Sequence, residues 1–263
     1  MENRHEQEIK KTIRKTYSKI ALQHDNNAGS PCCAPGCCSG GGADSPVKTA
    51  TIVGYESSEL ESVPQASVLG VGCGAPVKFA DLHEGETAVD LGSGAGIDVF
   101  LSSKQVGARG RVIGVDMTDE MLERARRSAK EGGYTNVEFR KGDIEKRIPV
   151  DENYADVVIS NCVINLTINK EKVFKEVHRI LKNGGRVVIS DLIADSEVAP
   201  IDANTEKWSS CIDGALTKEH YLDSIRKAGF ENLGILSEQP YMDGIEQIEG
   251  RKISSVIIKA VKI

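Results

Sequence analysis

Residues Val89-Asp90-Leu91-Gly92-Ser93-Gly94-Ala95-Gly96 decide the fold of this chain. An apolar run holds one acidic residue, glycines follow at every second position, and a helical pattern begins directly after Gly96. Glycines at such a turn let backbone amides approach a ligand without a Cβ in the way. The stretch therefore predicts a strand, a turn that binds a nucleotide-like ligand, and a helix.

The same alternation of strand and helix continues along the chain. Apolar runs typical of buried strands stand at residues 88–91, 112–115, 137–139, 157–160 and 187–190. Helical patterns stand at residues 97–105, 120–131 and 172–181. Because wholly apolar strands need cover on both faces, we expect a doubly wound parallel α/β sheet. Its active site lies at the carboxyl ends of the strands.

The remaining segments divide the chain. Residues 1–25 form an amphipathic helix, and residues 26–50 are rich in Gly, Ser and Cys and are expected to be flexible. Residues 51–263 form one domain. Its part from 195 to 263 is expected to cap the acceptor side and to close with an antiparallel hairpin of residues 233–237 and 255–261.

Composition excludes several classes of protein. The 263 residues are 40% hydrophobic and 27% charged, which is typical of a soluble globular protein. A net charge of −6 gives no basic field for nucleic acid, and no apolar run reaches the roughly 18 residues of a membrane span. Without an apolar secretory segment, we expect a cytoplasmic protein and take a monomer as the default. Seven cysteines then point to thiol chemistry.

Acidic residues follow the next two predicted strands. Asp116 closes the second, where a carboxylate can accept hydrogen bonds from a ribose diol. Asp143, in Gly142-Asp143-Ile144, follows the third, where it can read the amino group of adenine. A second glycine-rich turn, residues 68–76, contains Pro76 and lacks the acidic residue, so we expect a loop near the cleft.

The order of these pieces resembles the class I methyltransferase superfamily, which has a Rossmann-like fold, across about residues 65–240. The resemblance implies S-adenosylmethionine as the cofactor. It also implies the residues that bind it: Asp90, Gly92, Ser93, Gly94, Gly96, Asp116, Met117, Gly142, Asp143, Ile144 and Asn161.

Three cysteines far apart in sequence carry a second resemblance. Each of Cys73, Cys162 and Cys211, taken alone, is compatible with a simple buried side chain. Their flanking residues, 69–74, 160–166 and 211–216, together resemble the arsenite methyltransferases. That resemblance implies Cys162 and Cys211 as direct ligands of arsenic(III), Cys73 as third ligand or redox partner, and no catalytic metal. Soft thiolates suit soft arsenic.

The implied reaction needs electrons as well as a methyl group. Thiolates would orient the arsenic lone pair toward the methyl carbon, and each methylation oxidises arsenic, so thioredoxin or a small thiol is an expected partner. Cys32-Cys33 and Cys37-Cys38 would collect arsenic, shuttle electrons, bind zinc or do nothing essential, and these alternatives stay open. Longer family members carry a further carboxyl-terminal domain, which leaves the number of added methyl groups open.

Three other functions compete with this interpretation. A methyltransferase for a small organic acceptor, such as a quinone, predicts polar groups where Cys162 and Cys211 stand. A thiol-rich protein that binds heavy metals would need neither the glycine turn nor Asp116 and Asp143. A nicotinamide oxidoreductase needs a second mononucleotide-binding half, which the sequence after Asp143 does not supply.

Overall fold

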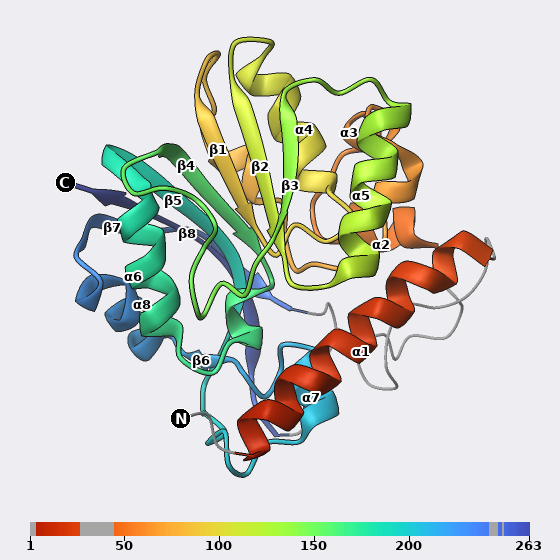
Figure 1. The fold of residues 1–263 in the computed structure, drawn as a ribbon. Helices are drawn as coiled ribbons and strands as arrows, with labels where there is room; N and C mark the ends of the chain where they lie inside the picture. Colours follow the sequence, from red (N-terminus) through yellow and green to blue (C-terminus); the bar gives the residue numbers. More distant parts are fainter. Residues whose placement is uncertain (1–3, 27–44, 242–246, 249) are drawn as a thin grey trace.

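A twisted sheet of eight strands forms the centre of the computed structural model, which describes residues 4–26, 45–241, 247–248 and 250–263 (Figure 1). The order is β3-β2-β1-β4-β5-β8-β7, and a short β6 pairs with β5. The first five strands are parallel. Their bounds are β1 Thr87–Leu91, β2 Arg111–Asp116, β3 Val137–Lys141, β4 Ala155–Asn161 and β5 Leu181–Ala194. The others are β6 Leu216–Thr217, β7 Phe230–Pro240 and β8 Ile253–Lys262.

Helices cover both faces of the sheet, which confirms the predicted doubly wound fold. The helices α4 (Ile97–Val106) and α5 (Asp119–Glu131) pack on one face, and α6 (Lys170–Ile180) and α8 (Lys218–Lys227) on the other (Figure 1). Each face is sealed by its own buried apolar cluster, with Phe100 in one and Phe174 in the other. Since the strands are buried on both faces, they need the continuous apolar runs seen in the sequence.

The carboxyl-terminal strands form the expected antiparallel pair, but β8 lies between β5 and β7. It pairs with β5 over Arg186–Ala194. Residues on both faces of β8 are buried, so its interior place in the sheet follows from its apolar composition. The two-residue strand β6 was not predicted, because a strand so short leaves no periodic pattern.

The amino-terminal helix α1 (Arg4–Asn26) lies where the sequence predicts an amphipathic helix, and it packs on α5 and α7 (Thr205–Ser209) (Figure 1). Its buried face includes Ile9 and Ile13. None of the helices in the described ranges is long and apolar enough to cross a membrane.

One expectation differs from the structure at the end of the range 26–50, where α2 (Pro46–Ile52) begins. Pro46 fixes the backbone angle of the first turn, and the Ser45 hydroxyl accepts a hydrogen bond from Lys48 N at 3.3 Å. Residues 46–50 are therefore helical, and the segment boundary predicted at residue 50 falls inside α2. Residues 27–44, with Cys32, Cys33, Cys37 and Cys38, lie outside the described residues. A third short helix, α3 (Ser57–Glu61), follows.

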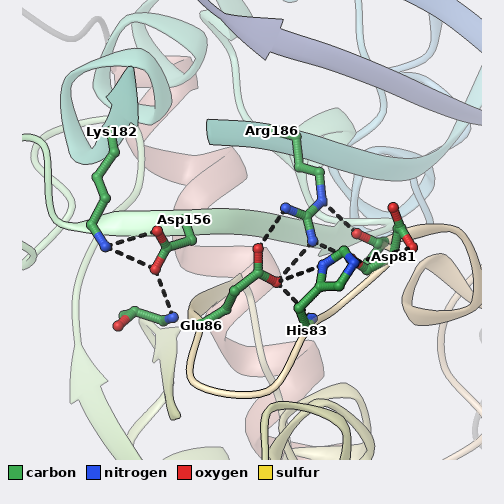
Figure 2. A network of polar contacts seen from close by, with 8 residues as sticks. Asp81, His83, Glu86, Asp156, Lys182 and Arg186 are labelled. Carbon is green, nitrogen blue, oxygen red and sulfur yellow. Dashed lines mark hydrogen bonds and ion pairs between the residues drawn. The ribbon is translucent and has the colours of Figure 1, made fainter. Parts of the chain in front are cut away.

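A group of ion pairs ties the amino ends of the strands together (Figure 2). Arg186 of β5 holds both carboxylate oxygens of Glu86 at 2.8 Å and donates to the Ala80 carbonyl at 2.6 Å. Burial alone would raise the pKa of Glu86, but the hydrogen bonds from Arg186 lower it below its usual value. Nearby, Lys182 pairs with Asp156 at 2.7 Å. These contacts fasten the segment that leads into β1 to the centre of the sheet.

Candidate active site

A cleft of about 1120 Å³, including its open mouth, lies at the carboxyl ends of the parallel strands. Of the eleven residues predicted to bind the cofactor, ten line this cleft: Asp90, Gly92, Ser93, Gly94, Asp116, Met117, Gly142, Asp143, Ile144 and Asn161.

Gly96 is the exception, since it does not line the cleft. It caps α4 with φ 95°, and a Cβ there would lie 2.9 Å from the Phe139 ring. Gly92 also has a positive φ of 68°, and a Cβ on it would lie 2.2 Å from Val163. The glycines therefore shape the turn by close packing as much as by leaving room for a ligand.

Three carboxyl groups, those of Asp90, Asp98 and Asp116, line the cleft. Burial raises the pKa of Asp90 well above its usual value, and the neighbouring Asp98 and Asp116 raise it further. Burial also raises the pKa of Asp98 to about 6, although hydrogen bonds from Tyr55, at 2.8 Å, and Asn161 counteract it. Such a cluster favours a ligand that carries positive charge.

Asn161, the last residue of β4, connects the cleft to the loop of residues 68–76. Its side-chain amide donates to the Gly74 carbonyl at 2.7 Å and to the Tyr55 hydroxyl at 2.9 Å, and its oxygen accepts from Cys73 N at 3.1 Å. Gly70, Val71 and Gly72 line the cleft, which confirms the prediction that this second glycine-rich segment is a loop beside it.

Helix α1 contributes part of the cleft that the sequence did not reveal. Lys10, Ile13 and Tyr17 line it, and Lys10 Nζ lies 3.3 Å from Asp143 Oδ2 and 3.0 Å from Glu145 Oε2. An amphipathic pattern identifies the buried face of a helix, but it does not say which part of the protein that face covers.

The three predicted thiol residues meet at one end of the cleft. Cys162 lines it, while Cys73 and Cys211 are each only 2% exposed. Cys73 Sγ, Cys162 Sγ and a carboxylate oxygen of Asp191 lie within 4.8 Å of one another, and Cys211 Sγ donates to the Cys162 carbonyl at 2.9 Å. Hydrogen bonds with Cys211 and Cys73, together with burial, raise the pKa of Cys162 well above its usual value. Without a bound ion, Cys162 is therefore a neutral thiol.

Comparisons with known proteins agree with this geometry. A family model described as "Methyltransferase domain" matches residues 82–229. An arsenite methyltransferase of Halobacterium salinarum is 38% identical over 246 residues, which cover 89% of this chain and 60% of that protein. The mouse arsenite methyltransferase is 40% identical over 170 residues, which cover 60% of this chain and 44% of that protein.

A crystal structure of an arsenic(III) S-adenosylmethionine methyltransferase from Chlamydomonas reinhardtii superposes with a TM-score of 0.64 at 30% identity. The match covers 83% of this chain and 74% of that chain. The chain belongs to the arsenite methyltransferase family. It spans about 60% of the length of the Halobacterium relative and 44% of the length of the mouse relative.

The cofactor of the family is S-adenosylmethionine, and the residues of the cleft fit that molecule. It carries a sulfonium and an ammonium group, which suit the cluster of Asp90, Asp98 and Asp116. The buried Ser93 hydroxyl has no hydrogen-bond partner among the described residues, so a polar ligand group can satisfy it.

Two of the three cysteines, Cys162 and Cys211, have unusual backbone angles. Cys162 has φ 56° and Cys211 has φ 68°, in the left-handed region that non-glycine residues rarely adopt. Packing holds the two loops together: the Trp208 indole donates to the Leu166 carbonyl at 2.9 Å, and a Cβ on Gly214 would lie 1.9 Å from the Asn165 carbonyl oxygen. Local strain of this kind persists only where the surrounding structure enforces it.

Asp191 is a residue that sequence reasoning missed in this family member. It is fully buried, and it accepts hydrogen bonds from Asn165 N at 3.0 Å and from the Tyr221 hydroxyl at 2.9 Å. Burial raises its pKa to about 6, while Lys170 acts in the opposite direction. A signal existed, because Asp191 directly follows the apolar run 187–190, just as Asp116 directly follows the apolar run 112–115.

Proposed function

We propose that this protein transfers a methyl group from S-adenosylmethionine to trivalent arsenic held by Cys73, Cys162 and Cys211. The convergence of these three thiols beside the cofactor cleft carries the proposal. Residues 49 or more positions apart in sequence have no need to meet there if each is only a small buried side chain. A role in arsenic detoxification follows from this reaction.

Arsenic binding uses the protonated thiols that burial favours. Each thiol replaces one hydroxide or one small-molecule thiolate on arsenic, and the displaced group leaves with the thiol proton as water or as free thiol. Three thiolates balance the three charges of arsenic(III), so the bound centre is neutral. A neutral product suits a buried site, where a net charge is costly.

Positioning is the main contribution of the protein to the transfer. The cofactor supplies a methyl group that is electrophilic because it is attached to a sulfonium sulfur. Cys162 lies at the boundary between cleft and thiol cluster, so arsenic on its sulfur faces the cofactor side. The arsenic lone pair carries no proton, and no general base is needed. Orientation of two reactants in this way lowers the barrier by supplying the entropy of encounter in advance.

After each methyl transfer, the arsenic must be reduced by two electrons before it can be methylated again. Arsenic becomes formally pentavalent when its lone pair forms the new bond, and two cysteine thiolates return it to the trivalent state by forming a disulfide. Thioredoxin or a small thiol then reduces that disulfide. We place the protein in the cytoplasm, where such reductants are present. All residues named for this reaction lie in one chain, with the segments 1–25, 26–50 and 51–263, so a monomer is sufficient for it.

The other functions explain the site less well. A methyltransferase for an organic acceptor requires polar groups at this end of the cleft, whereas the groups next to Cys162 include Val163 and Leu166. A protein that only stores heavy metals has no use for the carboxyl cluster of Asp90 and Asp98.

The test is methylation by the purified, reduced protein with S-adenosylmethionine, arsenite and a thiol reductant, followed by separation of arsenic species over time. We expect methylated arsenic from the wild type and a loss of about 100-fold or more in Cys162→Ser and Cys211→Ser, because a missing ligand misplaces the arsenic. Ser210→Ala, next to Cys211, is the matched control and retains activity. If wild-type protein with bound cofactor yields no methylated arsenic, the proposal fails and organic acceptors become the next candidates.

A further inference from the structure

Beyond arsenic, we propose that Cys73, Cys162 and Asp191 form a binding site for a thiophilic divalent cation, with Zn²⁺ as its representative. The site consists of two thiols and one carboxyl group, all on loops or strand ends at the carboxyl edge of the sheet. Binding of this cation is independent of the proposed methylation. Its competition with arsenic(III), which follows from the shared cysteines, rests on that function.

The distances suit such an ion after a small adjustment. The two sulfur atoms and the carboxylate oxygen lie within 4.8 Å of one another. In a tetrahedral zinc site, with bonds of about 2.3 Å to sulfur and about 2.1 Å to oxygen, the ligand atoms are about 3.5 to 3.8 Å apart. Side-chain shifts on the order of 1 Å bring these donors to that separation. Cys211 is not one of the three donors, since its Sγ donates to the Cys162 carbonyl at 2.9 Å.

Asp191 is held in the manner of a metal ligand. Its Oδ2 accepts from Asn165 N and from the Tyr221 hydroxyl, and its Oδ1 accepts from Leu192 N at 3.0 Å. A carboxylate oxygen can accept two hydrogen bonds, so Oδ1 keeps a lone pair for a cation. Hydrogen bonds from the surroundings orient ligating carboxylates in this way in many metal sites.

The net charge of the occupied site differs between this cation and arsenic(III). Two thiolates and one carboxylate around a divalent ion leave one negative charge, which the nearby Lys170 can balance. Lys170 is 5% exposed, and its Nζ lies 6.0 Å from the centre of the Trp208 ring. Arsenic(III) is already neutral with three thiolates and has no need of the carboxylate. The two ions therefore share Cys73 and Cys162, but only the divalent cation uses Asp191 and only arsenic depends on Cys211.

The experiment measures Zn²⁺ binding by competition with a chromophoric chelator, without arsenite or cofactor. All measurements use the whole chain with the substitutions Cys32→Ser, Cys33→Ser, Cys37→Ser and Cys38→Ser. These substitutions remove four thiols that could bind Zn²⁺ elsewhere. We expect one Zn²⁺ per chain, a loss of affinity of about tenfold or more in Asp191→Asn, and a change below about threefold in Cys211→Ser. Arsenite binding should show the reverse pattern in the same two variants.

Two further measurements keep the test decisive if Asp191→Asn does not fold. X-ray absorption at the zinc edge of the wild type should show an oxygen neighbour at about 2.0 to 2.2 Å beside sulfur at about 2.3 Å. Tyr221→Phe keeps the carboxylate and should retain Zn²⁺ binding. No Zn²⁺ binding, or a shell of sulfur alone, overturns the proposal. Zinc binding without any arsenic methylation would contradict only the proposed function.

Discussion

Affinity for S-adenosylmethionine should fall steeply as pH is lowered from 7.5 to 5.5. The cleft binds a ligand with positive charge through carboxylates that burial makes reluctant to ionise: the pKa of Asp98 is raised to about 6, and that of Asp90 is raised well above its usual value. A cationic ligand favours the ionised carboxylates. Protons therefore compete with it, and affinity is lost as pH falls through the raised pKa values.

The magnitude follows from the fraction of carboxylate that is ionised. With a pKa of about 6, Asp98 goes from almost fully ionised at pH 7.5 to about one quarter ionised at pH 5.5, which weakens binding about fourfold. Protonation of Asp90, whose pKa burial also raises, weakens binding further in the same direction. Protonation of the cofactor's own amino group over this interval favours binding by less than about twofold.

Isothermal titration of the cofactor at several pH values tests this expectation. Native-state carboxyls with raised pKa values bind protons more tightly than in the unfolded chain, so their contribution to the free energy of unfolding increases as pH falls through this window. Loss of affinity would thus not reflect unfolding caused by these groups. Asp98→Asn should weaken binding at pH 7.5 and flatten the dependence near pH 6. A dissociation constant that stays the same from pH 7.5 to 5.5 would refute the role given to the carboxyl cluster.

Other predictions concern packing and stability. Gly92→Ala should weaken cofactor binding about tenfold or more, because the new methyl group collides with Val163 at a positive φ, and Val163→Ala added to it should restore part of the affinity in the same titration. Arg186→Met should lower the free energy of unfolding in urea by about 2 kcal/mol, since it leaves the half-buried Glu86 without its partner (Figure 2). Arg109→Met, at an exposed ion pair, should change it by less than about 0.5 kcal/mol. Equal losses in both arginine variants would contradict this account.

The parallel sheet and most of the cofactor cleft could be predicted because their signals are local. A strand that is buried on both faces is apolar throughout, and a carboxylate at its end, such as Asp116, has few structural reasons to be there. The glycine turn after β1 also requires a particular backbone, which restricts the residues that can form it. The first strand and its glycine turn, for example, are recognisable in the eight residues 89–96.

The parts that escaped prediction depend on contacts between distant segments. Lys10 reaches Asp143 only because α1 packs across the cleft, and nothing in residues 4–26 specifies that partner. The interior place of β8 depends on competition between two strands for the edge of β5. The family resemblance predicted that Cys73, Cys162 and Cys211 form one site. Asp191 belongs to no motif that the resemblance uses, so it was not predicted.

The position of β8 between β5 and β7 has a consequence for biosynthesis. When residues 181–240 have left the ribosome, the apolar edge of β5 has no neighbour on that side, and it stays open until residues 253–262 are made and inserted. An open edge of buried-type residues is a template for pairing with another nascent chain. The interval between the synthesis of β5 and the insertion of β8 is therefore the period in which two nascent chains can pair along this edge.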